Sequence, residues 1–289
     1  MTKTSLRANV TPAALAKEIE IAYRALKSPV GGLLSWVIVE GAGDRKAFSR
    51  FFQIPEGCRI SIAYSKSTVI AAVDNLLKKK SLGVMLPEVI GIVDRDDPEF
   101  AVSGSNLPIF LTDYRDLECM IFATDAVLDA LERVETKGLL QKYPSDAIVD
   151  ISVDAAAVVG ALYIAAARLN RKHLLRSLPR EKYFDAERLE IDRQAIWEFF
   201  KDAELAQVAQ SIYEKHEHLK IARGHDLFEF LALMLNVGGS METKDQTRQY
   251  LERTFLNCYT IKYFSESSLF KNLHRFQEKR SLRVVRNIS

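Results

Sequence analysis

The sequence predicts an α/β fold in which a parallel β-sheet is flanked by helices and carries an inserted α-helical subdomain. Two continuously apolar runs, residues 33–39 and 89–93, have the composition of strands buried on both faces. Strand-like and helix-like patterns alternate over residues 33–112, as they do in βαβαβ units whose strands are parallel. Residues 125–216 are helical in pattern, and the alanine-rich and leucine-rich segment 154–175 is the strongest case.

The first helix is expected from about residue 12 to residue 26, because Thr11 is a good N-cap and Pro12 suits the first helical position. A helix is expected to begin near Asp44, after the first strand. The further elements of the sheet region are a strand at 59–64, a helix at 68–80, and strands at 89–93 and 108–112. Late in the chain, residues 219–224 fit a short returning strand, and Asp226 is placed to cap an apolar helix at 227–235.

These patterns divide the chain into four regions. They are an N-terminal helix at 1–30, a sheet core at 31–124, a helical insertion at 125–217, and a return to the core with a basic C-terminal segment at 218–289. From residue 262 onward, seven Lys or Arg stand against two Glu. A positive segment of this kind is a candidate for contact with nucleic acid.

Composition sets broad limits on function. The 289 residues are 48% hydrophobic and 27% charged, with a formal net charge of +2, which does not by itself indicate a nucleic-acid partner. Cys58, Cys119 and Cys258 form no C-x-x-C pair, so neither a disulfide framework nor a structural zinc site is expected. No secretory h-region is expected, and no apolar stretch of about eighteen residues. The expected location is the cytoplasm, without membrane insertion.

Acidic residues follow two of the predicted strands. Glu40 and Gly41 end the first apolar run, and Asp94 and Asp96 follow the third strand. The carboxyl ends of neighbouring parallel strands meet at one edge of a sheet, so these carboxylates are expected to surround a common point. Hard oxygen ligands suit Mg²⁺ or Mn²⁺. The alternative is that the acidic groups cap helices or turns.

Several basic residues are candidates for phosphate contacts. Ser65 and Lys66 follow the second strand and begin a helix, where a substrate phosphate is stabilised; the alternative is a turn with a solvated lysine. Cations expected to contact a nucleic-acid backbone are Arg168, Arg171, Lys172, Arg223, Lys279 and Arg280. Interleaved aromatic residues, Phe264, Phe270 and Phe276, are candidates for stacking on unpaired bases, although core packing is the commoner role of such residues.

Four segments carry a family resemblance. The pattern Val-Ile-Val-Glu40-Gly41-x-x-Asp44, followed by Ile-Val-Asp94-Arg-Asp96, resembles the Toprim domain of topoisomerases, primases and OLD-type nucleases. The segment Asp-Tyr-Arg-Asp-Leu-Glu at 113–118 and the segment Arg-Gly-His-Asp at 223–226 are similar to Toprim effectors encoded beside ABC-type ATPases in anti-phage systems such as PARIS.

This resemblance implies a Toprim-like sheet and a Mg²⁺-dependent endonuclease that cleaves RNA, with tRNA favoured and DNA as the other substrate. The residues implied in catalysis are Glu40, Asp94, Asp96, His225 and Lys66. The residues implied in metal binding are Glu40, Asp44, Asp94, Asp96 and Glu118. The family further implies a toxic effector regulated by an ABC-type ATPase partner and active as a homodimer.

One position departs from the family pattern. Related nucleases carry a lysine where this chain has His225, and histidine is only partly protonated near neutral pH. Arg223 and Lys66 are the candidates to supply the missing charge. The non-enzyme alternative is therefore a degenerate Toprim module that binds a partner or nucleic acid.

Other enzyme classes explain fewer of the motifs. A nucleotide-sugar transferase would use the D-x-D of Asp94 and Asp96 but leaves Glu40 and Gly41 unexplained. A haloacid-dehalogenase phosphatase would need Thr or Val at Pro98. A covalent topoisomerase is not expected, because this chain has no room for the separate domain that carries the cleavage tyrosine. A primase is not expected, because three scattered cysteines cannot form its zinc-binding module.

Overall fold

The computed structural model describes residues 10–26, 35–54, 57–100, 106–134, 138–236 and 244–286. The chain divides into two compact units, each assembled from separate segments. Unit 1 comprises Met1–Asp94, Ala101–Thr112 and Phe264–Ser289, and unit 2 comprises Arg95–Phe100 and Asp113–Tyr263. The segment expected to return to the sheet from residue 218 therefore belongs to unit 2 as far as Tyr263.

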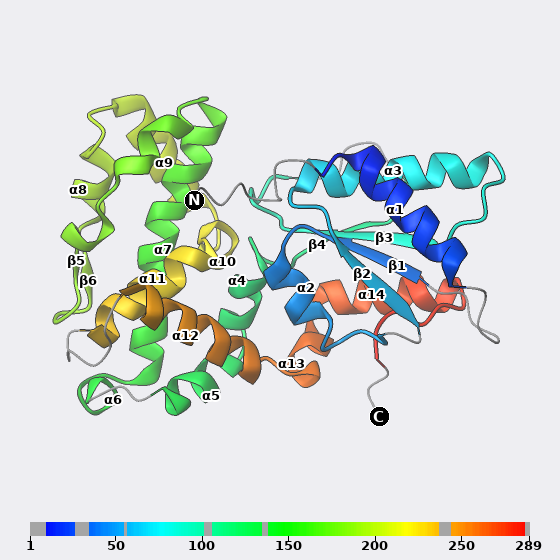
Figure 1. Ribbon diagram of the computed structural model, residues 1–289. Helices are drawn as coiled ribbons and strands as arrows, with labels where there is room; N and C mark the ends of the chain where they lie inside the picture. The colour runs from blue at the N-terminus through cyan, green and yellow to red at the C-terminus, as the bar shows by residue number, and fades with distance from the viewer. Residues whose placement is uncertain are drawn as a thin grey trace, which may run out of the picture. The chain divides into compact units, whose positions relative to one another are not determined.

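Unit 1 is built on a four-stranded parallel sheet with the order β2-β1-β3-β4 (Figure 1). Its strands are β1 (Ser35–Val39), β2 (Cys58–Ile62), β3 (Glu88–Val93) and β4 (Ile109–Leu111). All five residues of β1 are buried, as are five of the six residues of β3, because both strands lie inside the sheet. The α/β class and the parallel sheet predicted from the sequence are confirmed.

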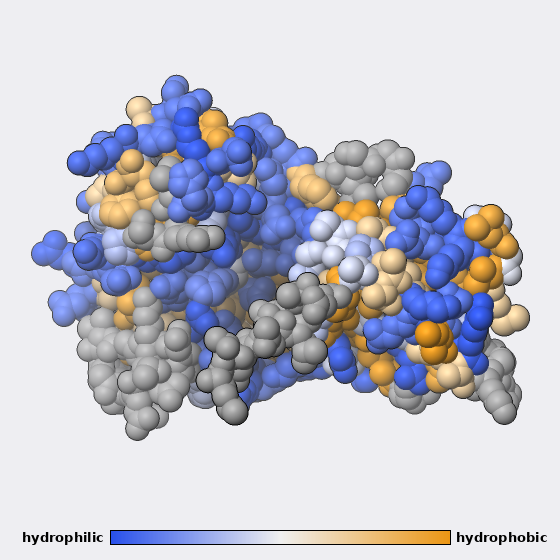
Figure 2. Space-filling view, turned by 45° about the horizontal axis from the view of Figure 1, so that its top comes forward, coloured by the Kyte–Doolittle hydropathy of each residue, from blue (hydrophilic) through white to orange (hydrophobic). Residues whose placement is uncertain are grey.

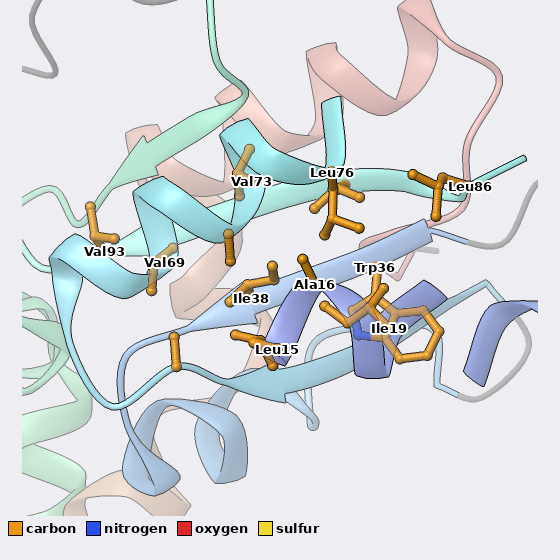
Figure 3. Close-up of a cluster of buried hydrophobic side chains, with 13 residues drawn as sticks. Leu15, Ala16, Ile19, Trp36, Ile38, Val69, Val73, Leu76, Leu86 and Val93 are labelled. Atoms are coloured by element: carbon orange, nitrogen blue, oxygen red, sulfur yellow. The ribbon is translucent and has the colours of Figure 1, made fainter. Parts of the chain in front are cut away.

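Two helices cover one face of this sheet. They are α1 (Pro12–Ala25), which Thr11 caps by accepting a hydrogen bond from the Ala14 amide, and α3 (Lys66–Ser81). Figure 3 shows side chains from both helices meeting the strands, among them Ile19, Val73 and Ile38. This layer buries the apolar faces that the sequence pattern of each helix predicts.

Aromatic side chains dominate the packing around α2 (Ala42–Phe48), α13 (Ile261–Glu266) and α14 (Ser268–Lys279). Phe51 stacks on Phe264 with ring centroids 4.6 Å apart, and Phe264 meets Phe270 edge to face at 5.5 Å. Phe264 and Phe270 are buried, so the expectation that they stack on nucleic-acid bases is wrong. They belong to the core because their rings have aromatic partners within the unit.

The end of the chain is part of the same core. Val284 and Val285 are buried, and Val285 forms an isolated antiparallel bridge with Phe52. The buried side-chain oxygen of Gln277 accepts hydrogen bonds from both valine amides, at 2.9 and 3.0 Å. The basic segment therefore consists of exposed charges on a backbone that is fixed to unit 1.

Unit 2 is helical apart from a short antiparallel pair of strands. Its α-helices are α4 (Leu117–Phe122), α5 (Ala126–Arg133), α6 (Leu139–Lys142), α7 (Ser145–Arg168), α8 (Arg193–Glu198), α9 (Ala203–Lys215), α10 (His218–Ile221), α11 (Gly224–Asn236) and α12 (Lys244–Cys258). Two 3₁₀ helices, η2 (Lys172–Ser177) and η3 (Arg180–Lys182), precede the strands β5 (Phe184–Asp185) and β6 (Glu190–Ile191). Helix α7 packs against α9, α10 and α11.

Two sequence-based expectations about unit 2 are wrong. The expected strand at 219–224 is instead the short helix α10 and the turn after it, because the carbonyl of Ile221 accepts a hydrogen bond from the distant Arg115 side chain. Helix α7 is long and apolar enough to cross a membrane by length and composition, although no such stretch was expected. Most of its apolar window, 61%, is buried inside the structure, as in the core helix of a folded domain.

The surface drawn in Figure 2 is largely hydrophilic, with scattered apolar groups. Large exposed hydrophobic side chains include Ile21, Leu82 and Met85 of unit 1. The apolar side of α11 is not among them, since Leu227, Phe228 and Leu231 are buried. That helix is a core element of unit 2.

Candidate functional site

The ends of β1 and β3 bring two predicted site residues together. These strands are parallel neighbours, with Val39 paired to Ile92, so Glu40 and Asp94 emerge at the same edge of the sheet. The backbone amide of Asp94 donates a hydrogen bond to Oε1 of Glu40 at 2.9 Å. Both side chains are half-buried. The convergence of the first and third strands at this edge agrees with the sequence-based expectation.

Asp44 has a structural role at the start of α2. Its Oδ2 accepts a hydrogen bond from the Gly41 amide at 2.7 Å, which closes the turn between β1 and the helix. A Cβ atom at Gly41 would lie 3.2 Å from that same oxygen, so the small residue permits the tight turn. Asp44 thus acts first as a helix-capping carboxylate, and one of its two oxygens is directed to the backbone.

Ser65 and Lys66 stand at the end of β2, the strand on the other side of β1. Ser65 is the N-cap of α3: its hydroxyl accepts from the Thr68 amide at 3.2 Å and donates to the Thr68 hydroxyl at 2.8 Å. Lys66 is the first residue of this 16-residue helix. The edge of the sheet in unit 1 therefore carries Glu40, Asp94 and a helix start with a lysine.

Tyr64, directly before this helix, was not singled out from the sequence. Its φ of +64° lies in the left-handed region, which a bulky side chain rarely adopts, and its side chain is 43% exposed. No pattern in the sequence predicts a positive φ at this residue. Strained residues of this kind are concentrated at binding and catalytic sites, so Tyr64 joins the candidate site residues.

The remaining predicted residues belong to unit 2. Asp96 is exposed, has a φ of +57°, and donates its amide hydrogen to the carbonyl of Arg115 at 3.1 Å. Glu118 lies in the first turn of α4, against Gly224: a Cβ atom added at Gly224 would be 2.3 Å from the Glu118 Cβ. The structure therefore brings Glu118 beside the segment 223–226 that contains His225.

Two sequence motifs that are about 108 residues apart are joined by Asp116. One of its oxygens caps α4 by accepting from the Cys119 amide at 2.9 Å, and the other accepts from the Gly224 amide at 2.7 Å. Next to it, the buried Arg115 side chain donates to the carbonyls of Ile221 and Gly160. Burial lowers the pKa of the Arg115 guanidinium, and the neighbouring Asp116 charge opposes this shift. The motif 113–118 thus fixes the start of α11.

His225 lies between a guanidinium and two carboxylates. Its Nε2 is 2.5 Å from Nη1 of Arg248, and its Nδ1 is 3.4 Å from Asp226 and 3.7 Å from Glu229. Because arginine only donates, Nε2 of the neutral ring accepts and Nδ1 carries the hydrogen. The fixed positive charge beside this histidine therefore comes from Arg248. This pairing could not be predicted from the sequence, because Arg248 is 23 residues from His225 and no periodic pattern connects the two positions.

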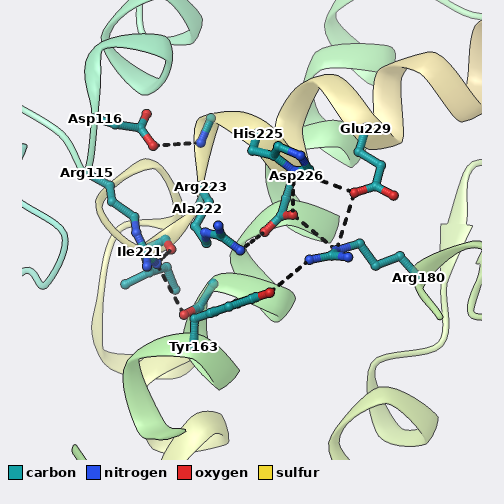
Figure 4. Close-up of polar contacts among 12 residues, drawn as sticks. Arg115, Asp116, Tyr163, Arg180, Ile221, Ala222, Arg223, His225, Asp226 and Glu229 are labelled. Carbon is teal, nitrogen blue, oxygen red and sulfur yellow. Dashed lines mark hydrogen bonds and ion pairs between the residues drawn. The ribbon is translucent and has the colours of Figure 1, made fainter. Parts of the chain in front are cut away.

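Asp226 is buried among cations, as Figure 4 shows. Its carboxylate is 3.1 Å from Nε of Arg180 and 3.5 Å from Nη1 of Arg223. The Arg223 guanidinium stacks on Tyr163, with its Cζ 3.9 Å from the ring centroid. Burial by itself would raise the pKa of the Asp226 carboxyl. The hydrogen bond from His225 and the charges of both arginines instead hold that pKa below its usual value.

One group of potential metal ligands is drawn together within the described residues. The ligand atoms of His225, Asp226 and Glu229 all lie within 4.8 Å of one another. Arg180 pairs with both carboxylates, at 3.1 and 3.6 Å, so a cation already neutralises this group and a divalent ion would have to displace it. We therefore interpret the group as an ion-pair network. Among the described residues, the strand-end carboxylates do not form a group of three whose ligand atoms all lie within 4.8 Å of one another.

The strand-end carboxylates nevertheless have the donor chemistry that Mg²⁺ prefers. This ion is usually held by one or two carboxylates, and its remaining positions are filled by water or substrate phosphate. Glu40 and Asp94 supply two carboxylates from the ends of adjacent parallel strands. The residues present therefore fit a Mg²⁺ or Mn²⁺ ion.

The cations expected to contact nucleic acid have different surroundings. Arg168 makes two hydrogen bonds to Asp97, at 2.8 and 3.1 Å, and Arg171 pairs with Asp202 at 2.8 Å and Glu204 at 2.7 Å. These carboxylates neutralise both arginines.

The other predicted cations are more accessible. Lys172 and Lys279 are exposed, whereas Arg280 pairs with Glu88 at 3.2 Å and stacks on Phe276. Of these residues, the two lysines are the better placed to meet a phosphate.

Comparison of the chain with models of known protein families, with characterised proteins and with solved structures finds no match. The resemblance to Toprim nucleases therefore rests on the four sequence motifs.

Proposed function

We propose that the protein is a metal-dependent nuclease that hydrolyses phosphodiester bonds at the strand-end edge of unit 1. The observation that carries this proposal is the pairing of Glu40 and Asp94 at the carboxyl ends of adjacent parallel strands, linked by a hydrogen bond. Ligands of open α/β sheets bind outside the carboxyl ends of the strands, and the sheet order reverses around β1 in this unit. A Toprim-like core is the finer fold assignment that this placement supports.

Each residue has a proposed role. Glu40 and Asp94 would hold Mg²⁺ or Mn²⁺, and Asp44 of the same unit is a further candidate ligand. Asp96 and Glu118 belong to unit 2 and are candidate ligands on the motif resemblance alone. The bound ion would activate the attacking water and stabilise the charge that develops on the leaving oxygen. Lys66, at the start of α3, is assigned to charge compensation at a substrate phosphate, supported by the positive end of the helix dipole.

The substrate and the biological setting follow from the motif resemblance. We infer RNA, with tRNA favoured over DNA, and the role of a toxic effector controlled by an ABC-type ATPase. His225 would act in this scheme as part of the Arg248 pair, because Arg248 provides the permanent charge beside it. Growth arrest on expression of the wild type, absent for a Glu40 variant, is the expected cellular result.

A second candidate function is a module that binds nucleic acid or a partner without cutting. Two observations favour it: the strand-end carboxylates are not tightly clustered among the described residues, and Asp44 is engaged in helix capping. In that case, added Mg²⁺ would leave every nucleic acid intact.

Cleavage assays with a matched pair of variants separate the two functions. Glu40→Gln retains an oxygen that accepts from the Asp94 amide, so the fold is preserved while the charge is lost. Asp74→Asn removes the same charge from an exposed ion pair with Lys78 in the same unit, at a cost of about 0.5 kcal/mol or less. With tRNA, total RNA or DNA and Mg²⁺, Glu40→Gln should cut at least about 100-fold more slowly than Asp74→Asn.

Equal cleavage by the two variants would refute the proposal. A wild type that binds nucleic acid but cuts none with Mg²⁺ or Mn²⁺ would establish the second candidate instead.

A further inference from the structure

Three cations of unit 1 differ from Arg168 and Arg171 of unit 2 in having no carboxylate partner among the described residues. They are Arg45 and Lys46 of α2 and Arg59 of β2, for which the described part of the chain contains no ion pair. Nε of Arg59 is moreover buried without a hydrogen-bond partner among those residues. Unlike Arg168 and Arg171, these groups retain an uncompensated charge that an anion could neutralise.

The same three cations line a cavity of about 480 Å³, here named the α2–β2 groove. Its other walls include the apolar side chains of Trp36, Ile60 and Ile62. The Trp36 indole donates its hydrogen to Ser61 at 2.9 Å, which fixes the ring. A groove lined by both positive and apolar groups suits a ligand that combines anionic groups with flat or apolar ones, as a nucleotide strand does.

The groove leads to the candidate metal site. In the sheet register Arg59 pairs with Trp36, and Ile62 pairs with Val39, the residue before Glu40. Three residue steps along β2 therefore cover about 10 Å and end beside the strand-end carboxylate. Arg45 and Lys46 come directly after Asp44 in α2. A strand that entered the site at Glu40 would continue along these cations.

We propose that the α2–β2 groove binds the sugar-phosphate backbone of an unpaired nucleic-acid segment next to the bond that is cut. This inference rests on the proposed function and adds a substrate-binding surface to it. An acidic peptide on the outer edge of β2 is the competing occupant. Nucleic acid is favoured because β2 and α2 carry these cations within a few residues of the strand-end carboxylates, where phosphate chemistry is proposed.

The test measures binding apart from cleavage. A fluorescently labelled single-stranded oligonucleotide, as RNA and as DNA, is titrated with protein in EDTA, and anisotropy is recorded between 50 and 200 mM salt. The variant Arg45→Gln/Lys46→Gln/Arg59→Gln should bind about tenfold more weakly, with a slope of log K against log salt reduced by about 2. Lys78→Gln removes an exposed cation of α3 and should bind within about twofold of the wild type.

Two further variants guard the interpretation. Arg45→Lys/Arg59→Lys preserves the charges and should keep the salt slope of the wild type. If this variant also bound weakly, the loss in the glutamine variant would be assigned to disturbed folding and not to lost charge. Glu40→Gln should bind as the wild type does while failing to cut. This pair of readouts distinguishes failure of the groove from failure of the nuclease assignment.

Wild-type affinity and slope in the triple glutamine variant would overturn the groove proposal, even if cleavage that depends on Glu40 were observed. The proposal would be overturned in favour of an acidic peptide if the triple glutamine variant lost the binding of labelled poly-glutamate but still bound the oligonucleotide as the wild type does. Groove-dependent binding by a wild type that never cuts would support the groove and refute the nuclease.

Discussion

Substitution of Gly224 by alanine tests how closely the two motifs of unit 2 are packed. A Cβ atom at this position would lie 2.3 Å from the Cβ and 2.8 Å from the Cγ of Glu118, and 2.9 Å from Oδ1 of Asp116. All three distances are too short for van der Waals contact. The first turns of α4 and α11 would therefore have to move apart.

The size of the effect follows from two losses and one gain. Overpacking of a closed contact costs about 1–3 kcal/mol. The hydrogen bond from the Gly224 amide to the Asp116 carboxylate, 2.7 Å long, is worth about 1.5–3 kcal/mol when the acceptor is charged. Alanine returns about 1 kcal/mol as the better helix former. Gly224→Ala should therefore lower the free energy of unfolding by about 1.5–5 kcal/mol.

The matched control is Gly43→Ala in α2, where an added Cβ meets nothing within 4 Å. This variant should be more stable than the wild type by about 0.5–1 kcal/mol, through helix propensity alone. Urea unfolding followed by circular dichroism gives both values. Fluorescence of Trp197 in a Trp36→Phe background assigns the loss to unit 2. An unfolding free energy of Gly224→Ala within 0.5 kcal/mol of the wild type would refute the argument.

Three further outcomes are expected. Asp226→Asn should cost about 3–5 kcal/mol at pH 7, because it leaves buried arginines without their carboxylate. The pKa of Asp226 is lower in the folded than in the unfolded protein, so the carboxylate stabilises the fold fully above the unfolded pKa near 3.9, and this stabilisation is lost as pH falls through the folded pKa. The difference in unfolding free energy between the wild type and Asp226→Asn should therefore shrink between pH 7 and pH 3. An equal difference at both pH values would contradict the pairing. Tyr64→Gly should be more stable than Tyr64→Ala by about 1 kcal/mol in urea unfolding, because glycine adopts the positive φ without strain; equal stability would show that the strain is absent. Burial raises the pKa of the Cys58 thiol to about 12 and that of Cys119 well above its usual value, so iodoacetamide at pH 8 should label them only after unfolding, as read by mass spectrometry, and labelling of the native protein would show these sites to be open.

The sheet was predictable because its strands have local patterns that match their surroundings. Residues 36–39 and 89–93 contain no polar side chain, and the structure buries them inside the sheet. Glu40 and Asp94 followed from the same reasoning, since the ends of parallel strands share an edge. The short run 219–224 could not be assigned locally, because its conformation depends on Arg115, more than 100 residues earlier.

The surroundings of the charged side chains were not predictable from sequence. Arg168 and Arg171 are part of a positive stretch in the sequence, yet folding places Asp97 and Asp202 against them. Arg45, Lys46 and Arg59 were not among the cations predicted from the sequence, because the lack of a carboxylate partner among the described residues is a property of the folded structure. Net charge along a chain does not report which charges folding neutralises.

The order in which the chain is made has a consequence for unit 1. Its sheet is complete by Thr112, but its core also needs Val284 and Val285, which follow the 151 residues Asp113–Tyr263 of unit 2. At a synthesis rate of 5–20 residues per second, those residues take roughly 8–30 s to emerge. The contact between Phe52 and Val285 can form only afterwards. The strand-end site thus lies in a unit whose core can be completed only after the whole of unit 2 has been synthesised.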